Sequence, residues 1–399
     1  MTSGSVVAGG FMTWIVASGY TGHSDPLVWC HLPGSRRLRR ATPREPRAPR
    51  RTGTGVVRGV RRAARGGRRC LQGQGNEEQV MTRFGYFLAS EEFTPAELLE
   101  QARAAEQAGF TCLAISDHYH PWTDEQGQSP FVWSMIGALA QATSLPVTTF
   151  VTCPTVRMHP AVNAQAVATA GVLTGNRFRF GVGSGEALNE HILGDAWPAV
   201  DVRLEMLEEA VHVIRALQSG DEVTHRGKHY TVENARLYTV PDEPVPIYVS
   251  GFGPKAAALA GRIGDGFVTM TPEADLVGQF RRAGGGQKPV LGGTKVCWGT
   301  DRDQAVKTAH RLWPTQFLPG ELGQVLPDPA HFEQAATLVT EEVVADGMVC
   351  GADADEHVRA VAAYVDAGFD EVYVGQIGPD QQGFFDFYRS DVLPRLDTR

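Results

Sequence analysis

The stretch FGYFLASEEFTPAELLEQARAAEQAGFTCLAIS, residues 84–116, decides the fold because it joins two apolar strands through an amphipathic helix. FGYFL (84–88) and CLAIS (112–116) are apolar throughout, which is typical of parallel strands buried on both faces. The helix between them opens with a capping box at Thr94 and ends at Gly109. This order predicts a right-handed parallel crossover.

The same alternation repeats until eight strand–helix units have passed. Further strands are predicted at 146–152, 178–183, 246–251, 266–270, 294–299 and 371–376. Further helices are predicted at 131–143, 161–174, 202–218, 254–262, 273–282, 303–312 and 382–396. Eight such units close naturally into a (β/α)₈ TIM barrel, an α/β fold. An open doubly wound sheet is the alternative, and it would need a switch-point fingerprint.

Two segments interrupt this alternation. Residues 222–240 alternate in polarity around a Gly, so they predict a β-hairpin inserted before the fifth strand. Residues 314–346 form a long excursion before a helix at 353–368. Excursions of that length commonly cover a site.

The first 80 residues differ in character from the rest. They hold 14 Arg and four carboxylates, a net charge of +10, whereas the whole chain carries −8. They are rich in Arg, Gly and Pro and show no period of 3.6 or 2, which predicts a disordered tail or a start codon assigned too far upstream, with Met81 as a natural start. No aromatic side chains are interleaved to stack bases, so no nucleic-acid partner is expected. The domain is predicted at 81–399.

The composition also limits location and metal use. No stretch approaches the roughly 20 apolar residues that span a bilayer, and no Lys or Arg precedes the short apolar run 11–18. We therefore expect a cytoplasmic protein without a membrane partner. The six cysteines include no Cys-x-x-Cys pair, so no metal site is expected.

In a barrel, function lies at the C-terminal ends of the strands. Asp117 and His118 end the second strand, and His is the side chain most easily used for proton transfer near neutral pH. Glu186 follows a Gly-rich turn after the fourth strand and is a candidate second acid or base. The alternatives are that His118 is a satisfied polar residue at a strand end and that Glu186 is an N-cap carboxylate.

Two Gly-rich turns raise the question of phosphate binding. GVGSGEA (181–187) has Glu186 where a dinucleotide fingerprint needs its third Gly, so a Rossmann site is rejected. SGFGPKAA (250–257) leads into a helix whose free N–H groups, with Lys255, suit an anion. The alternative is an ordinary βα turn.

Several motifs, in this order, resemble the bacterial luciferase-like superfamily, and within it the F420-dependent glucose-6-phosphate dehydrogenase subgroup. The resemblance runs from about Met81 to the C-terminus. It rests on ISDHYHPW, TCPTVRMHPA, NRFRFGVGSGEALNE and VPIYVSGFGPKAAALAGRIGDGF. It implies a homodimeric barrel that holds the deazaflavin coenzyme F420 at its C-terminal face.

The resemblance also implies roles for individual residues. His118 would be the acid/base on the substrate hydroxyl, Glu186 the second proton-transfer carboxylate and Trp122 a wall of the reaction centre. Asp117 and Asn189 would contact the cofactor.

Further cofactor contacts are implied at the third strand and at the Gly-rich turn before the 254–262 helix. They are Cys153, Phe252, Gly253, Lys255 and Ala256. The last four would hold the phosphate-bearing tail of F420, and a cis peptide is implied near Phe150-Val151.

This chain departs from the subgroup at several positions. Cys153 replaces a Thr and Phe252 replaces a Gly of the cofactor site. The positions of the sugar-phosphate pocket that carry Thr, Lys, Lys and Arg in the subgroup correspond here to Met270, Glu273, Gly323 and Gly347. Because a phosphate needs cationic or N–H donors, glucose 6-phosphate is predicted not to be the substrate.

The sequence therefore predicts an F420-dependent oxidoreductase that transfers a hydride between C5 of the deazaflavin and a small alcohol or carbonyl substrate. An FMN-dependent luciferase-like monooxygenase and a non-catalytic flavin- or deazaflavin-binding paralogue are the alternatives.

Overall fold

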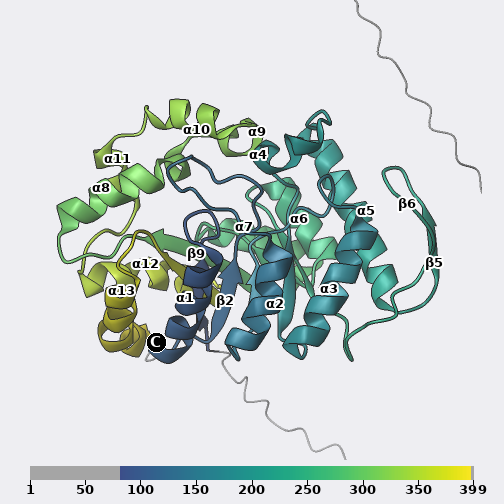
Figure 1. The fold of residues 1–399 in the computed structure, drawn as a ribbon, viewed down its shortest axis with the longest axis horizontal. Helices are drawn as coiled ribbons and strands as arrows, with labels where there is room; N and C mark the ends of the chain where they lie inside the picture. The colour runs from purple at the N-terminus through teal and green to yellow at the C-terminus, as the bar shows by residue number, and fades with distance from the viewer. Residues whose placement is uncertain (1–80, 397–399) are drawn as a thin grey trace, which may run out of the picture. The chain divides into compact units, whose positions relative to one another are not determined.

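The computed structural model describes residues 81–396, and these contain a closed barrel of eight parallel strands (Figure 1). The strands follow one another around the barrel in the order β1-β10-β9-β8-β7-β4-β3-β2. They are β1 (Arg83–Leu88), β2 (Cys112–Ile115), β3 (Val147–Thr149), β4 (Phe178–Val182), β7 (Ile247–Ser250), β8 (Gly266–Val268), β9 (Val290–Val296) and β10 (Glu371–Gln376). The predicted fold class is confirmed. The tail predicted at 1–80 lies outside the described residues.

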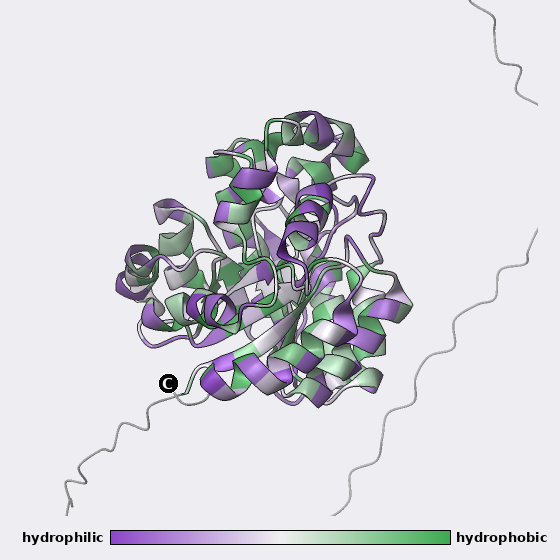
Figure 2. Ribbon diagram, turned by 90° about the vertical axis from the view of Figure 1, so that its left-hand side faces the viewer, coloured by the Kyte–Doolittle hydropathy of each residue, from purple (hydrophilic) through white to green (hydrophobic). Residues whose placement is uncertain are grey.

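Helices surround the barrel. The main ones are α1 (Pro95–Ala108), α2 (Val132–Ala142), α3 (Pro160–Thr174), α5 (Val200–Gln218), α6 (Pro254–Ile263), α7 (Ala274–Phe280), α8 (Arg302–Leu312), α12 (Ala354–Asp366) and α13 (Gln381–Phe387). Helix α7 continues into η2 (Arg281–Gly285), and α13 continues through η4 (Tyr388–Val392) into α14 (Leu393–Leu396). Hydrophobic and hydrophilic residues alternate around the helical ribbons in Figure 2, as expected where one side packs on the strands.

The capping residues predicted at both ends of α1 are present. The Thr94 hydroxyl accepts from the N–H of Glu97, and the Glu97 carboxylate accepts from the N–H of Thr94 at 2.9 Å, which completes the capping box. Gly109 follows the helix with a φ of 103°, a left-handed conformation that favours glycine.

The strand predicted at 294–299 was placed too far along the chain, because β9 runs from Val290 to Val296. The first half of β9 was missed because it contains Gly292 and Gly293, and glycine is uncommon in strands. A Cβ on Gly293 would lie 2.5 Å from the Tyr373 carbonyl oxygen of β10, so the close approach of the two strands requires glycine there.

A buried ion-pair network fills the N-terminal end of the barrel. Glu371, the first residue of β10, accepts hydrogen bonds from Arg179 of β4 and Arg83 of β1, and the Tyr373 hydroxyl donates to its other oxygen. Burial alone would raise the pKa of Glu371, but Arg179 and Arg83 outweigh burial and lower it. This network lies at the opposite end of the strands from the predicted site.

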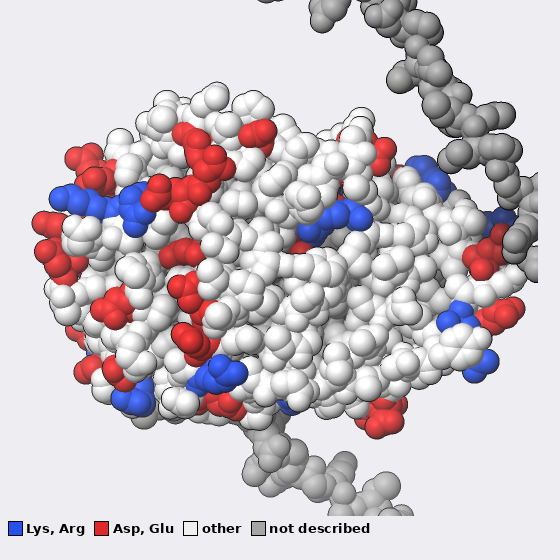
Figure 3. All heavy atoms as spheres, viewed as in Figure 1, with Lys and Arg blue, Asp and Glu red and all other residues white. Residues whose placement is uncertain are grey.

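Helices α2 and α3 present an uncharged face. Neither contains Asp, Glu, Lys or Arg. Phe131, Val162 and Leu173 are 55%, 52% and 47% exposed and line a surface groove of about 350 Å³. Both helices face the viewer in Figure 1, and most of the same area is without charge in Figure 3.

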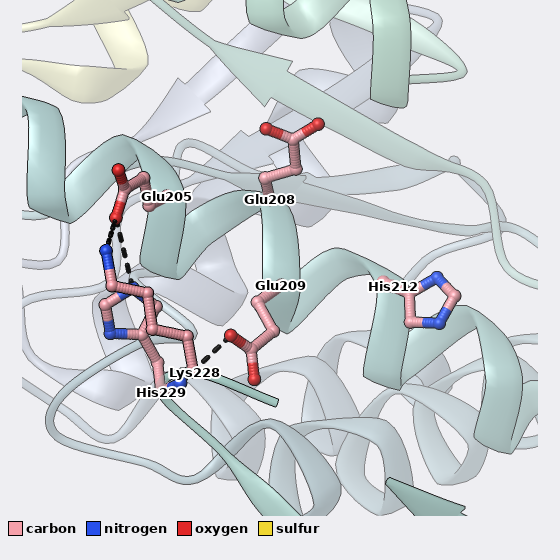
Figure 4. A pocket seen from close by; sticks show the side chains of 6 residues that line it. All are labelled: Glu205, Glu208, Glu209, His212, Lys228 and His229. Carbon is pink, nitrogen blue, oxygen red and sulfur yellow. Dashed lines mark hydrogen bonds and ion pairs between the residues drawn. The ribbon is translucent and has the colours of Figure 1, made fainter. Parts of the chain in front are cut away.

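The predicted hairpin is confirmed as β5 (Val223–Arg226) and β6 (Thr231–Ala235), an antiparallel pair. It is fastened to α5 by ion pairs around a groove of about 390 Å³ (Figure 4). Glu209 lies 3.0 Å from His225 Nε2, and Glu205 pairs with Lys228 and His229. Glu205 and Glu209 of α5 are therefore paired with basic side chains of the hairpin segment.

The excursion predicted at 314–346 consists of short helices. They are η3 (Pro314–Phe317), α9 (Leu322–Val325), α10 (Pro329–Ala336) and α11 (Glu341–Gly347). Of the helices between residues 81 and 396, none is both long enough and apolar enough to cross a membrane.

Candidate active site

Three titratable side chains from loops after different strands meet at the C-terminal rim of the barrel. Glu91 follows β1, His118 follows β2, and Glu186 follows β4. His118 Nε2 lies 3.4 Å from Glu91 Oε1 and 3.6 Å from Glu186 Oε2. The structure thus brings the predicted pair His118 and Glu186 together and adds Glu91 to it.

The imidazole of His118 is held in one orientation. Its Nδ1 lies 3.1 Å from the carbonyl oxygen of His120. Because a carbonyl only accepts, Nδ1 carries the hydrogen in this contact, and Nε2 is left to face the carboxylates. Glu91 is fixed in turn by the Ser116 hydroxyl, which donates to its Oε2 at 2.7 Å.

Burial raises the pKa of Glu186, and the neighbouring Glu91 raises it further. His118 and Lys295 act in the opposite direction, as does the amide of Asn189, which donates to Glu186 Oε2 at 3.1 Å. The net rise favours the protonated carboxyl. Its side chain remains 31% exposed, so a proton on it is accessible from the rim.

Asn189 and Trp122 complete the surroundings of the pair. Asn189 Oδ1 accepts from the N–H of Tyr119 at 2.8 Å and so ties the loop after β2 to the short helix α4 (Ala187–Glu190). The Trp122 ring lies 5.1 Å from the His118 ring and 5.0 Å from Phe332 of α10, between ring centroids. The excursion therefore packs against the wall of the site.

Asp117 lies in a buried charge cluster beside this site. Its Oδ1 accepts from Arg157 Nη2 at 2.9 Å, and only 3% of its side chain is exposed. The N–H of Arg157 also donates to Glu190 Oε2 at 2.7 Å. Burial raises the pKa of Glu190 to about 7, although Arg157 opposes the rise. That Asp117 contacts a cofactor remains a prediction.

Cys153 packs beneath the Gly-rich turn after β4. Its Sγ lies 3.0 Å from Thr155 Oγ1, and burial raises the pKa of the thiol to about 12. A Cβ on Gly185, whose φ is 83°, would lie 2.5 Å from this sulfur. The thiol therefore stays protonated and shapes the turn that carries Glu186.

The turn before α6 is open. Gly253 is the N-cap of α6 without a side-chain cap, and a Cβ on it would meet nothing within 4 Å. Phe252 beside it is 57% exposed. The Lys255 ammonium, in the first turn, lies 2.7 Å from Asp201 Oδ1 on the surface. Unpaired N–H groups and free space at this end of α6 fit an anion.

The rim also holds a lysine that was missed from sequence and a further glutamate that follows the first strand. Lys295 of β9 places its Nζ 4.0 Å from the centroid of Trp313, and Glu92 accepts from Trp313 Nε1 at 2.7 Å. A single Lys inside an apolar strand was the available signal for Lys295. Within residues 81–396, no group of three or more His, Cys, Asp or Glu could hold a metal ion.

None of the four residues predicted to correspond to sugar-phosphate positions, Met270, Glu273, Gly323 and Gly347, is a cation. Met270 and Glu273 follow β8, and Glu273 is exposed and accepts from the Thr271 hydroxyl at 3.2 Å. Gly323 lies in α9, and Gly347 ends α11.

A family model described as luciferase-like monooxygenase matches residues 80–371. The chain therefore belongs to the luciferase-like family, in agreement with the closed barrel. A curated relative from Microbacterium testaceum, named F420-dependent glucose-6-phosphate dehydrogenase, is 38% identical over 333 residues, which cover 80% of this chain and 99% of the relative. A relative of the same name from Mycobacterium tuberculosis is 36% identical and covers 79% and 98%.

Two solved structures of F420-dependent enzymes are also similar to this chain. An F420-dependent secondary alcohol dehydrogenase in complex with an F420–acetone adduct has a TM-score of 0.74 and 32% identity, over 80% of this chain and 99% of that chain. An F420-dependent tetrahydromethanopterin reductase from Methanopyrus kandleri shares the fold, with a TM-score of 0.64 and 19% identity over 79% and 99%. The relatives' names give no support to the expectation that glucose 6-phosphate is excluded.

Proposed function

We propose that this chain is an F420-dependent oxidoreductase that oxidises an alcohol, or reduces the corresponding carbonyl. The observation that carries the proposal is the meeting of His118 Nε2 with Glu91 and Glu186 at the rim of a luciferase-like barrel. The relatives at 36–38% identity and the alcohol dehydrogenase structure at 32% are all named F420-dependent. F420, when bound, supplies the hydride acceptor or donor at C5 of its ring.

His118 is the proposed base for the substrate hydroxyl. Its Nδ1–H is directed at the His120 carbonyl, so the lone pair of Nε2 faces the rim. Glu91 lies close enough to Nε2 to stabilise the imidazolium that forms when His118 takes the proton. Trp122 packs beside the ring and keeps water from that side.

Glu186 is the proposed second proton-transfer group. Burial raises its pKa and so favours the protonated carboxyl, whose proton can pass to or from the rim. Asn189 orients Oε2 of this carboxyl.

The proposed cofactor contacts come from four loops. Asp117, Asn189 and Cys153 lie around the rim after β2, β4 and β3, and Cys153 acts through the shape of the turn above it. Phe252, Gly253, Lys255 and Ala256 belong to the open turn before α6. The free N–H groups of that turn fit the phosphate-bearing tail.

Cofactor choice tests the proposal directly. F420 and FMN are titrated into the purified chain, and binding is followed by fluorescence. We expect F420 to bind and to be reduced when an alcohol is added. FMN binding without F420 binding would favour the monooxygenase, and F420 binding without reduction by any alcohol, or oxidation by any carbonyl, would favour a non-catalytic paralogue.

Glucose 6-phosphate is proposed not to be the substrate. Met270 and Glu273 occupy positions where the subgroup has polar and cationic side chains, and the Glu273 carboxylate repels a phosphate. The test compares F420 reduction by glucose 6-phosphate, glucose and 2-propanol. Turnover with glucose 6-phosphate at the lowest KM would refute this part of the proposal alone.

The chain is also proposed to form a homodimer through α2 and α3. A contiguous face without charge, with Val162 and Leu173 exposed, is typical of a surface covered by another protein. Light scattering should give twice the chain mass for the wild type and the single mass for Leu173→Glu. Val343→Glu, at an exposed position of α11, is the matched control and should remain dimeric. A monomeric wild type would refute the dimer.

A further inference from the structure

The ammonium of Lys295 lies among aromatic rings at the mouth of the barrel. Its Nζ is 4.0 Å from the Trp313 ring centroid and 4.7 Å from that of Phe87. Among residues 81–396, no acceptor forms a hydrogen bond or an ion pair with this ammonium. All three N–H donors are therefore available to a molecule that enters the site.

The nearby carboxylates do not satisfy this ammonium. Glu91, Glu92 and Glu186 attract it, but burial outweighs them, and the pKa of Lys295 is lowered. Glu91 already accepts from Ser116, and both oxygens of Glu92 are engaged, by Trp313 Nε1 and by the Gly378 N–H at 2.7 Å each. A partly buried cation without an acceptor gains more than an exposed one when a ligand oxygen arrives.

We propose that Lys295 binds a second oxygen of the substrate, next to the carbinol oxygen that His118 deprotonates. Lys295 lies over the Trp313 ring, Trp313 donates to Glu92, and the adjacent Glu91 lies 3.4 Å from His118 Nε2, so Lys295 and His118 belong to the same rim. Glu91 and Glu186 also act electrostatically on Lys295. The inference rests on the proposed function and narrows its substrate class.

The charges around Lys295 indicate the chemical class of the second substrate oxygen. Glu91, Glu92 and Glu186 all act on Lys295, and each of these carboxyl groups repels a carboxylate or phosphate at this point when it is ionised. A neutral hydroxyl accepts from the ammonium without that cost. The substrate class is therefore a neutral vicinal diol or polyol.

The test uses one matched pair of probes, cyclohexanol and 1,2-cyclohexanediol, with F420. The wild type should show the higher kcat/KM for the diol. Lys295→Met should lower kcat/KM for the diol roughly 10- to 100-fold, as expected for the loss of a charged hydrogen bond, and leave cyclohexanol within about twofold. Lys307→Met, at an exposed position of α8, is the control and should change neither value.

Equilibrium binding gives a second readout that needs no turnover. Calorimetry on the protein saturated with reduced F420, which cannot accept a hydride from an alcohol, should show tighter binding of the diol than of cyclohexanol, and Lys295→Met should abolish the difference while the Kd for F420 stays unchanged. If Lys295→Met lowers kcat/KM and affinity equally for both probes, or if the wild type does not prefer the diol, the role of Lys295 is overturned. Absence of F420 binding overturns the proposed function instead.

Discussion

Glu92 connects three parts of the rim, and its replacement by Gln gives the sharpest test of the electrostatics described above. The carboxylate follows β1, accepts from Trp313 at the start of the excursion and accepts from the Gly378 N–H after β10. Burial raises its pKa from 4.5 to about 7, although both hydrogen bonds and Lys295 oppose the rise. The folded protein therefore disfavours the charged form.

The sign and size of the effect follow from that pKa. A carboxyl whose pKa is raised on folding contributes most to stability below pH 4.5, and the contribution is lost as pH rises toward 7. At about 1.4 kcal/mol for each pH unit between the two pKa values, the loss amounts to about 3 kcal/mol. The side chain in Glu92→Gln cannot ionise, so the variant does not lose this unfolding free energy as pH rises. Relative to wild type, the variant should gain about 3 kcal/mol of unfolding free energy between pH 4 and pH 8.

The assay is urea unfolding of both proteins at several pH values, followed by tryptophan fluorescence. Every other titrating group is common to both proteins and cancels in the difference. The amide of Gln offers one acceptor oxygen where the carboxylate offers two. This loss shifts the difference in unfolding free energy by the same amount at every pH and leaves its dependence on pH unchanged. A difference that stays flat from pH 4 to pH 8 would show that Glu92 titrates normally and refute the reasoning.

Three further predictions concern catalysis and folding. His118→Gln should lower kcat about 10²- to 10⁴-fold and leave the Kd for F420 within about threefold, measured by steady-state kinetics and fluorescence titration; unchanged turnover would remove His118 from the mechanism. Glu371→Gln should lower the free energy of unfolding at pH 7 by about 3–5 kcal/mol, because Arg179 loses its buried partner, and a loss under 1 kcal/mol in urea would contradict this. Because the pKa of Glu371 is lowered, the difference should shrink as pH falls below 4.5. Gly181→Ala should abolish soluble expression, since a Cβ there would lie 1.9 Å from a backbone oxygen; normal yield would argue against the close strand packing.

The fold was predictable because its signals are local. The capping box at Thr94, Gly109 and the apolar runs act over a few residues, and each can be recognised without a neighbour. The one displaced strand shows the limit of this reasoning. Gly292 and Gly293 give a weak strand signal, and only the packing against β10 explains why glycine stands there.

The candidate site was only partly predictable. The sequence placed Asp117, His118 and Glu186 at strand ends, and the barrel rule placed those ends at one rim. It did not show that Asp117 is ion-paired with Arg157, because the two are separated by 40 positions and belong to different loops.

What the sequence by itself determined is the order of strands and helices and the kinds of side chain at each strand end. What only the tertiary structure decided is which charges share a space. Lys295 lies more than a hundred positions from Glu186, yet barrel closure buries both in one electrostatic environment. Because desolvation and Coulomb energies depend on distance in space, no local pattern could reveal the unpaired ammonium or the raised pKa of Glu92.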